Sequence, residues 1–157
     1  MTLGISLSTR TVAMAVLDRD FLYDYHTSFF KEQWSQGKLD KIIRAIGQYA
    51  ASYKIEAIVF IHGELHYVTA EIRQLLTAIK DYFENHDIAV HRYQFSDLRS
   101  FYGESRAKRR TLMQTLADRF PELRLAHRKE LVNHKKYYTK LFEAIAGALI
   151  HTEHCLS

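Results

Sequence analysis

The first 18 residues constrain the fold more than any other segment. Over residues 2–8, bulky apolar side chains alternate with small ones. The alternating residues are Leu3, Gly4, Ile5, Ser6, Leu7 and Ser8. This two-residue period predicts a β-strand with one face made of small side chains. A second apolar strand is expected over 11–18, so the N-terminus predicts a hairpin of two short apolar strands.

The rest of the chain predicts an α/β protein. A turn at 18–20 leads to a third strand over 21–30, which would complete an antiparallel meander. Further strands are expected over 55–61, a continuous apolar run typical of a buried parallel strand, and over 88–93. Helices are expected over 35–53 with Ser35 as N-cap, 67–85, 106–119 and 137–154. The order β-β-β-α-β-α-β-α-α predicts a five-stranded mixed sheet with helices on its faces.

Two regions of the C-terminal half break this regularity. A turn is expected near 96–102, and Pro121 should end the helix over 106–119. The segment 122–136 is polar and basic, and we expect it to be irregular. By contrast, the last helix is apolar on nearly every side over 141–150, so it should be buried against the sheet.

Length and composition set broad limits. The 157 residues fit one domain, 1–157, and are enough to bury a core. The single cysteine, Cys155, allows no internal disulfide and favours a reducing compartment. We see no secretion signal and no apolar run long enough to cross a bilayer, so we expect a cytoplasmic protein without a membrane partner.

The charge is unevenly distributed. Residues 99–140 contain twelve Lys and Arg but four Asp and Glu, a local net charge of +8, and the rest of the chain carries −4. Such a basic region is typical of proteins that bind a polyanion, although a plain solvated helical face gives the same pattern. The residues expected to contact DNA or RNA are Arg10, Arg106, Lys108, Arg109, Arg110, Lys135 and Lys136.

Aromatic residues accompany these charges. Tyr23, Tyr25, Phe29 and Phe30 lie on the expected third strand, and Tyr137 and Tyr138 follow two lysines. Aromatic side chains beside basic ones can stack on the bases of single-stranded nucleic acid. Ordinary half-buried packing against the sheet is the alternative.

Four segments carry a resemblance to a known family. The opening Leu-Gly-Ile-x-x-x-Thr-x-x-x-Ala-x-Ala-Val-Leu, at 3–17, is similar to the first hairpin of the ribonuclease H-like superfamily. Residues 55–61 look like its central strand, 98–108 like a basic Gly-containing turn before a helix, and 142–149 like its final helix. Within that superfamily the pattern resembles the Holliday-junction resolvase branch of the RuvC and YqgF type, and bacterial proteins that share a degenerate form of it.

The resemblance also implies that a catalytic centre is incomplete. Active members hold two Mg²⁺ ions with about four carboxylates. The first-strand Asp is Ser6 here, and the Glu at the end of the central strand falls near His62, with Glu64 two residues on. In the final helix the first acid is Glu143 and the second position is Ala146. We therefore assign no catalytic residue and expect no cofactor, and Glu64 and Glu143 are the remaining metal candidates.

Two histidine-containing clusters offer weaker alternatives. The run His62-Gly63-Glu64-Leu65-His66 follows a buried strand and could bind a metal or do acid–base work, although a polar loop is the simpler interpretation. At the C-terminus a metal could be shared by His151, His154 and Cys155, with His127 or His134 nearby.

Three functions remain open at this point. The first is a catalytically degenerate RuvC-like domain that binds nucleic acid through residues 99–140. This interpretation favours a protein without enzymatic activity. The second is a protein-interaction or structural domain, possibly a homodimer, with no nucleic-acid ligand. The third is a nuclease dependent on Mg²⁺ or Mn²⁺, with a rearranged site built on Glu64, Glu143 and His62.

Overall fold

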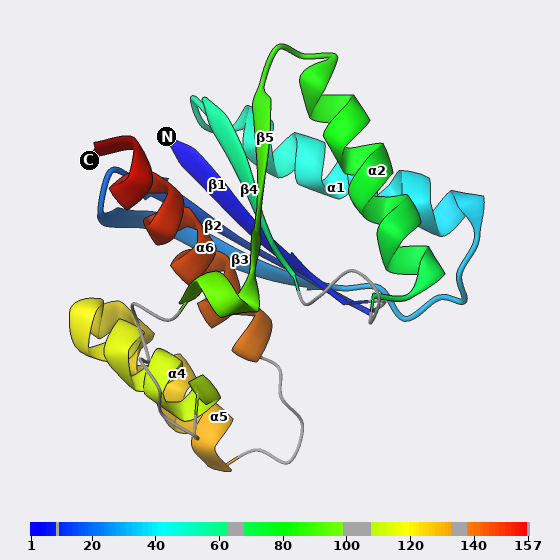
Figure 1. The fold of residues 1–157 in the computed structure, drawn as a ribbon. Coiled ribbons are helices and arrows are strands. Elements are labelled where there is room, and N and C mark those ends of the chain that lie inside the picture. The colour runs from blue at the N-terminus through cyan, green and yellow to red at the C-terminus, as the bar shows by residue number, and fades with distance from the viewer. Residues whose placement is uncertain (9, 63–67, 99–107, 133–137, 157) are drawn as a thin grey trace.

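A mixed sheet of five strands forms the centre of the computed structural model, which describes residues 1–8, 10–62, 68–98, 108–132 and 138–156 (Figure 1). The strands are β1 (Thr2–Leu7), β2 (Thr11–Asp18), β3 (Phe21–Phe29), β4 (Ala57–His62) and β5 (Ala89–Gln94), in the order β3-β2-β1-β4-β5. β1, β2 and β3 form the antiparallel meander, and β4 lies parallel to both β1 and β5. The predicted fold class is confirmed.

Helices cover both faces of this sheet (Figure 1). They are α1 (Gln36–Ala51), α2 (Ala70–Glu84), α4 (Lys108–Arg119), α5 (Arg124–Val132) and α6 (Thr139–Leu156), with short 3₁₀ turns η2 (Phe95–Leu98) and η3 (Pro121–Leu123). One core lies between the sheet and α1 with α2, and a second lies between the sheet and α6 with α4. No helix in the described part of the chain is long and apolar enough to cross a bilayer.

The alternation along β1 decides which side chain meets which core. Leu3, Ile5 and Leu7 belong to the core under α1 and α2. The small residues face α6, because a Cβ on Gly4 would lie 2.1 Å from the carbonyl oxygen of Ala144. The small-residue face predicted from the sequence therefore lets α6 approach the sheet closely, and it turns Ser6 toward that helix.

The expected N-cap of α1 is confirmed. The Ser35 hydroxyl accepts a hydrogen bond from the backbone N–H of Lys38 at 3.1 Å, and so it satisfies one of the free donors of the first turn. The other expected strands and helices match the observed elements, with ends that differ by a few residues.

The expectation of an irregular segment over 122–136 is wrong for its described part, because 124–132 form α5. The buried residues Leu123, Ala126, His127 and Glu130 follow the i, i+3, i+4, i+7 spacing of one helix face. Two of these four positions are polar, so the segment shows no apolar stripe in the sequence.

Candidate functional site

A buried polar cluster lies where β1 meets α6. The Ser6 hydroxyl donates a 2.9 Å hydrogen bond to Oε2 of Glu143, and both side chains are buried. Ser6 is in this position because the small-residue face of β1 packs on α6. Glu143 occupies a turn of α6 that is otherwise apolar, between Phe142 and Ala144.

Lys140 completes the cluster. Its Nζ lies 3.1 Å from the same Oε2 of Glu143, one helical turn earlier, and 5.4 Å from the ring centroid of Phe95. The Lys140 side chain is 25% exposed, so its ammonium group lies at the mouth of the cluster. A buried carboxylate requires partners that offset the cost of its desolvation. For Glu143 these partners are the ammonium group of Lys140 and the hydroxyl of Ser6.

The second acid position that the resemblance implies in the final helix, Ala146, offers no metal ligand. Ala146 is fully buried in the core that includes Ala13 and Ala15. A Cβ on Gly4 would contact Ala144 and Ala148. After Glu143, α6 therefore runs along β1 toward the start of that strand. The residue one turn before Glu143 is the one that shares its carboxylate, and that residue is Lys140.

His62 does not join Ser6 and Glu143. It is buried at the end of β4, and alternation places it on the face of Ile58 and Phe60, in the core under α1 and α2. Glu64 and His66 lie outside the described residues. Of the predicted acid-site residues, the structure therefore brings together Ser6 and Glu143.

The remaining metal candidates have other surroundings. The His151 ring packs on His91 with 4.2 Å between centroids, and its Nδ1 lies 3.1 Å from the Tyr93 hydroxyl. The His127 ring packs on Phe142. Within the described ranges no three His, Cys, Asp or Glu side chains come close enough to hold a metal ion. His134 and the side chains of His154 and Cys155 lie outside the described part.

Basic residues gather on α4 and α5, which together with η3 between them we call the basic lobe (residues 108–132). It contains seven Lys and Arg against three Asp and Glu, a net charge of +4, whereas α1 and α2 together contain five against four. The exposed cations with described side chains are Arg110, Arg119, Arg124, Arg128 and Lys129. Arg119 faces Glu153 and Asp20, so it is partly neutralised.

Of the predicted nucleic-acid contacts, Arg10 and Arg110 are exposed. The backbones of Lys108 and Arg109 lie in α4, but their side chains, like Arg106, Lys135 and Lys136, are outside the described part. Lys140 and the α5 cations Arg124, Arg128 and Lys129 were not singled out from the sequence. The spacing of Lys140 and Glu143, three residues apart on a helix, is the signal that could have identified their pairing.

A buried carboxylate ties the basic lobe to α6. Glu130 on α5 is fully buried, and it accepts 2.8 and 2.9 Å hydrogen bonds from the Tyr138 backbone N–H and the Thr139 hydroxyl. It thereby occupies the N-terminus of α6, where backbone N–H groups favour a negative charge. The contact fixes α5 next to the turn of α6 that carries Lys140 and Glu143.

Comparisons with known proteins show similarity at the level of the fold. No family model matches the chain, and no curated protein matches it in sequence. The Thermus thermophilus RuvC structure is similar with a TM-score of 0.73 at 12% identity, over 99% of this chain and 95% of RuvC. T. thermophilus RuvC in complex with Holliday junction substrate gives 0.69 at 13% identity, over 99% and 94%. The fowlpox virus resolvase bound to its substrate Holliday junction DNA gives 0.67 at 13% identity, over 99% of each chain.

The fold is therefore ribonuclease H-like, as the resemblance implied, and that fold raises the question of a two-metal centre. Such a centre needs several carboxylates with oxygen atoms free to bind the ions. The described residues of this cluster supply one carboxylate, Glu143, and its Oε2 already faces both Ser6 and the ammonium group of Lys140. These residues do not fit a pair of Mg²⁺ ions.

Proposed function

We propose that this chain binds DNA or RNA without cutting it, with the basic lobe as the principal contact surface for phosphates. The observation that carries the proposal is the concentration of exposed cations on a lobe held against α6. Arg110, Arg124, Arg128 and Lys129 add positive charge there, and few acidic side chains oppose them. Neutralising phosphates releases condensed counterions, which drives binding of this kind.

The fold supports the same proposal. T. thermophilus RuvC and the fowlpox virus resolvase were both solved in complex with Holliday junction DNA. A four-way junction is thus the first ligand to try, with duplex and single-stranded nucleic acid beside it.

The polar cluster supports the part of the proposal that excludes cleavage. Lys140 places a fixed positive charge beside Glu143, and Ser6 offers a neutral hydroxyl in place of a second carboxylate. An ammonium group repels a divalent cation while it still attracts a phosphate. This part of the chain is thus poorly suited to activate water on metal ions.

The test is a salt series with fluorescently labelled four-way junction, duplex and single-stranded DNA and RNA. We expect affinity to fall steeply as salt rises, with a log–log slope of roughly 0.9 per phosphate neutralised on duplex DNA and about 0.7 on single strands. If none of these ligands binds at low salt, the proposal is wrong and a protein-interaction role becomes the leading explanation.

A further inference from the structure

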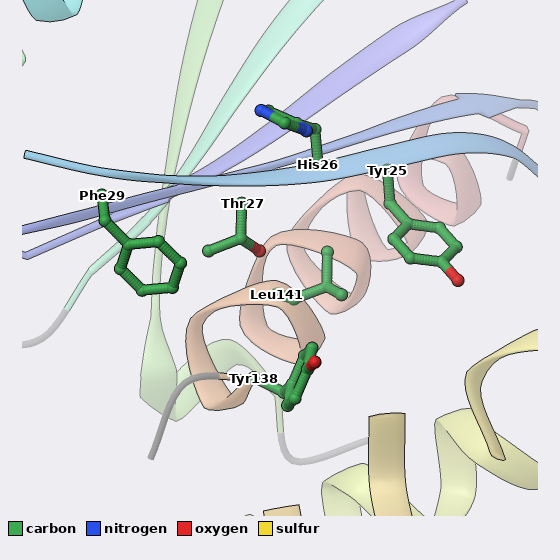
Figure 2. Close-up of a pocket in the computed structure, with 6 residues that line it drawn as sticks. All are labelled: Tyr25, His26, Thr27, Phe29, Tyr138 and Leu141. Carbon is green, nitrogen blue, oxygen red and sulfur yellow. The ribbon is translucent and has the colours of Figure 1, made fainter. Parts of the chain in front are cut away.

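A groove lies between the edge strand β3 and the first turn of α6, and its volume is about 440 Å³ (Figure 2). In Figure 2, Tyr25, Thr27 and Phe29 point from β3 toward the helix, where Tyr138 and Leu141 face them. His26 also borders the groove, but its ring points to the other side of the strand. The volume falls within the range of small-ligand sites.

The rings in this groove are open to solvent. Tyr25 is 36% exposed and Phe29 is 48% exposed, although β-strand aromatic residues usually bury one face against neighbours. Thr27 lies between them along the strand and adds a hydroxyl to an otherwise apolar wall. The groove thus offers flat apolar surfaces with one polar group between them.

The groove lies beside the polar cluster, on the same face of the sheet. Ser6 pairs with Ala13 across β1 and β2, and Ala13 pairs with Thr27 across β2 and β3. Directly paired residues of antiparallel strands share a face, so Thr27 points to the same side as Ser6. Two strand spacings separate them, a distance of about 10 Å.

Positive charge flanks the groove. At its Phe29 end the next residue, Phe30, donates its backbone N–H to the carbonyl oxygen of Arg10 at 2.8 Å, and the side chains of Arg10 and Lys31 are exposed. Lys140 precedes the groove residue Leu141 on α6, but its ammonium group is paired with Glu143 and does not line the groove. Of the described residues that line the groove, none carries a carboxylate.

We propose that this groove takes an unpaired nucleobase, stacked on the rings of Tyr25, Phe29 and Tyr138, while Arg10 and Lys31 contact the adjoining phosphates. The proposal rests on the proposed function and makes it more specific, because it selects single-stranded or locally unpaired nucleic acid over continuous duplex. Stacking on aromatic side chains beside a basic groove is the general way in which proteins bind unpaired strands. The flanking cations favour this ligand over an apolar peptide or a second copy of the chain.

The test compares variants that remove one aromatic ring of the groove with a variant that removes an exposed aromatic ring outside it. Tyr25→Leu and Phe29→Leu should weaken single-strand binding by about 5- to 150-fold each, the range expected for loss of one stacked base. They should also abolish the quenching of a 2-aminopurine placed in the oligonucleotide, and they should change duplex binding little. Phe21→Leu is the matched control, since Phe21 lies on the same strand, is 66% exposed and does not line the groove.

A conservative variant guards against misfolding. Tyr25→Phe keeps the ring and should bind as the wild type does, and melting temperatures of all variants establish that they fold. If the wild type binds nucleic acid with steep salt dependence but the ring variants bind single strands equally well, the groove proposal is wrong and the proposed function stands. If the wild type binds no nucleic acid, the groove proposal and the proposed function are both wrong. If Phe29→Leu instead converts a dimer to a monomer in sedimentation velocity, the groove is an interface between copies.

Discussion

Three side chains, Ser6, Lys140 and Glu143, form the buried polar cluster between β1 and α6. Glu143 alone would be a buried, uncompensated charge, and Lys140 and Ser6 together remove that cost. The cluster thus stabilises the packing of α6 on β1. Its carboxylate is already engaged, so a metal ion would have to displace Lys140 before it could bind there.

We predict that two substitutions turn this cluster into a cation site. Ser6→Asp with Lys140→Ala adds a carboxylate beside Glu143 and removes the competing ammonium group. With Mn²⁺ at about 100 times its Kd, the double variant should gain about 2.7 kcal/mol of stability, seen as a rise of roughly 5 to 11 °C in Tm. Wild type should show no such rise.

The matched control is Ser6→Asn with Lys140→Ala, which has the same shape and no added charge. A Mn²⁺-dependent rise in the Tm of the wild type that disappears in Glu143→Gln would show that Lys140 does not block the cation.

Asp24 on β3 should make stability depend on acid pH. Partial burial raises the pKa of this carboxyl, but hydrogen bonds from the Tyr53 hydroxyl and the Tyr25 backbone N–H outweigh that effect, so the pKa is lower than the ordinary 3.8. A lowered pKa contributes stability above the unfolded-state value, and this is lost as the pH falls through the folded-state value. The Tm difference between wild type and Asp24→Asn should be largest at pH 7 and should decrease below pH 3.8. A difference that stays constant across this range would contradict the assignment.

At the scale of elements, a close backbone approach joins β1 and α6. It depends on Gly4, where any Cβ would meet the carbonyl oxygen of Ala144. We expect Gly4→Ala to lower the free energy of unfolding by about 1–3 kcal/mol or more, since backbone atoms must shift. Gly37→Ala is the control, because its Cβ would meet the Ser35 hydroxyl at an ordinary 3.7 Å and alanine favours the helix. Urea unfolding of both variants measures the difference, and equal stabilities would refute the close packing.

The elements also show where sequence reasoning succeeds and where it fails. β1 and β4 are predicted well because an alternating pattern and a continuous apolar run are both local signals, and Ser35 marks the start of α1 for the same reason. α5 is not predicted, because polar residues, His127 and Glu130, hold two of its core-facing positions. No apolar stripe is therefore visible in the sequence. Glu130 is tolerated there only because it binds the N-terminus of α6, a contact that no local pattern reveals.

The site follows the same division. The resemblance correctly directs attention to Ser6 and Glu143, which are 137 residues apart and yet hydrogen-bonded. The resemblance does not identify Lys140, because it concerns the positions of metal-binding carboxylates and not those of cations. The groove is also beyond sequence reasoning, since its walls come from β3 and α6 and meet only in the folded chain.

On the scale of the whole molecule, the two sides of the sheet differ in charge. The basic lobe has a net charge of +4, whereas α1 and α2 together have +1, and the lobe lies on the side of α6, away from α1 and α2 (Figure 1). A nucleic acid bound on this side would contact the lobe, Lys140 and the groove together. The opposite side has nearly balanced charges and no comparable attraction for phosphate.

Removing charge from one side should therefore change the salt dependence selectively. The double variant Arg128→Gln with Lys129→Gln is expected to lower the magnitude of the salt slope by about 1 to 2 units, because each lost phosphate contact removes roughly 0.9. Lys80→Gln on α2 removes a half-buried cation from the opposite side and should leave the slope unchanged. Fluorescence anisotropy over a salt series measures both, and equal effects would mean that the lobe is not the contact surface.

The most direct test reads binding and strand integrity from the same sample. Excess protein is mixed at low salt with a labelled four-way junction, with Mg²⁺ or Mn²⁺ present, and anisotropy is recorded before the strands are resolved on a denaturing gel. We predict a complex that dissociates as salt is added and strands that remain intact. Strands cut by the wild type but not by Glu143→Gln, or no complex at the lowest salt, would contradict the account.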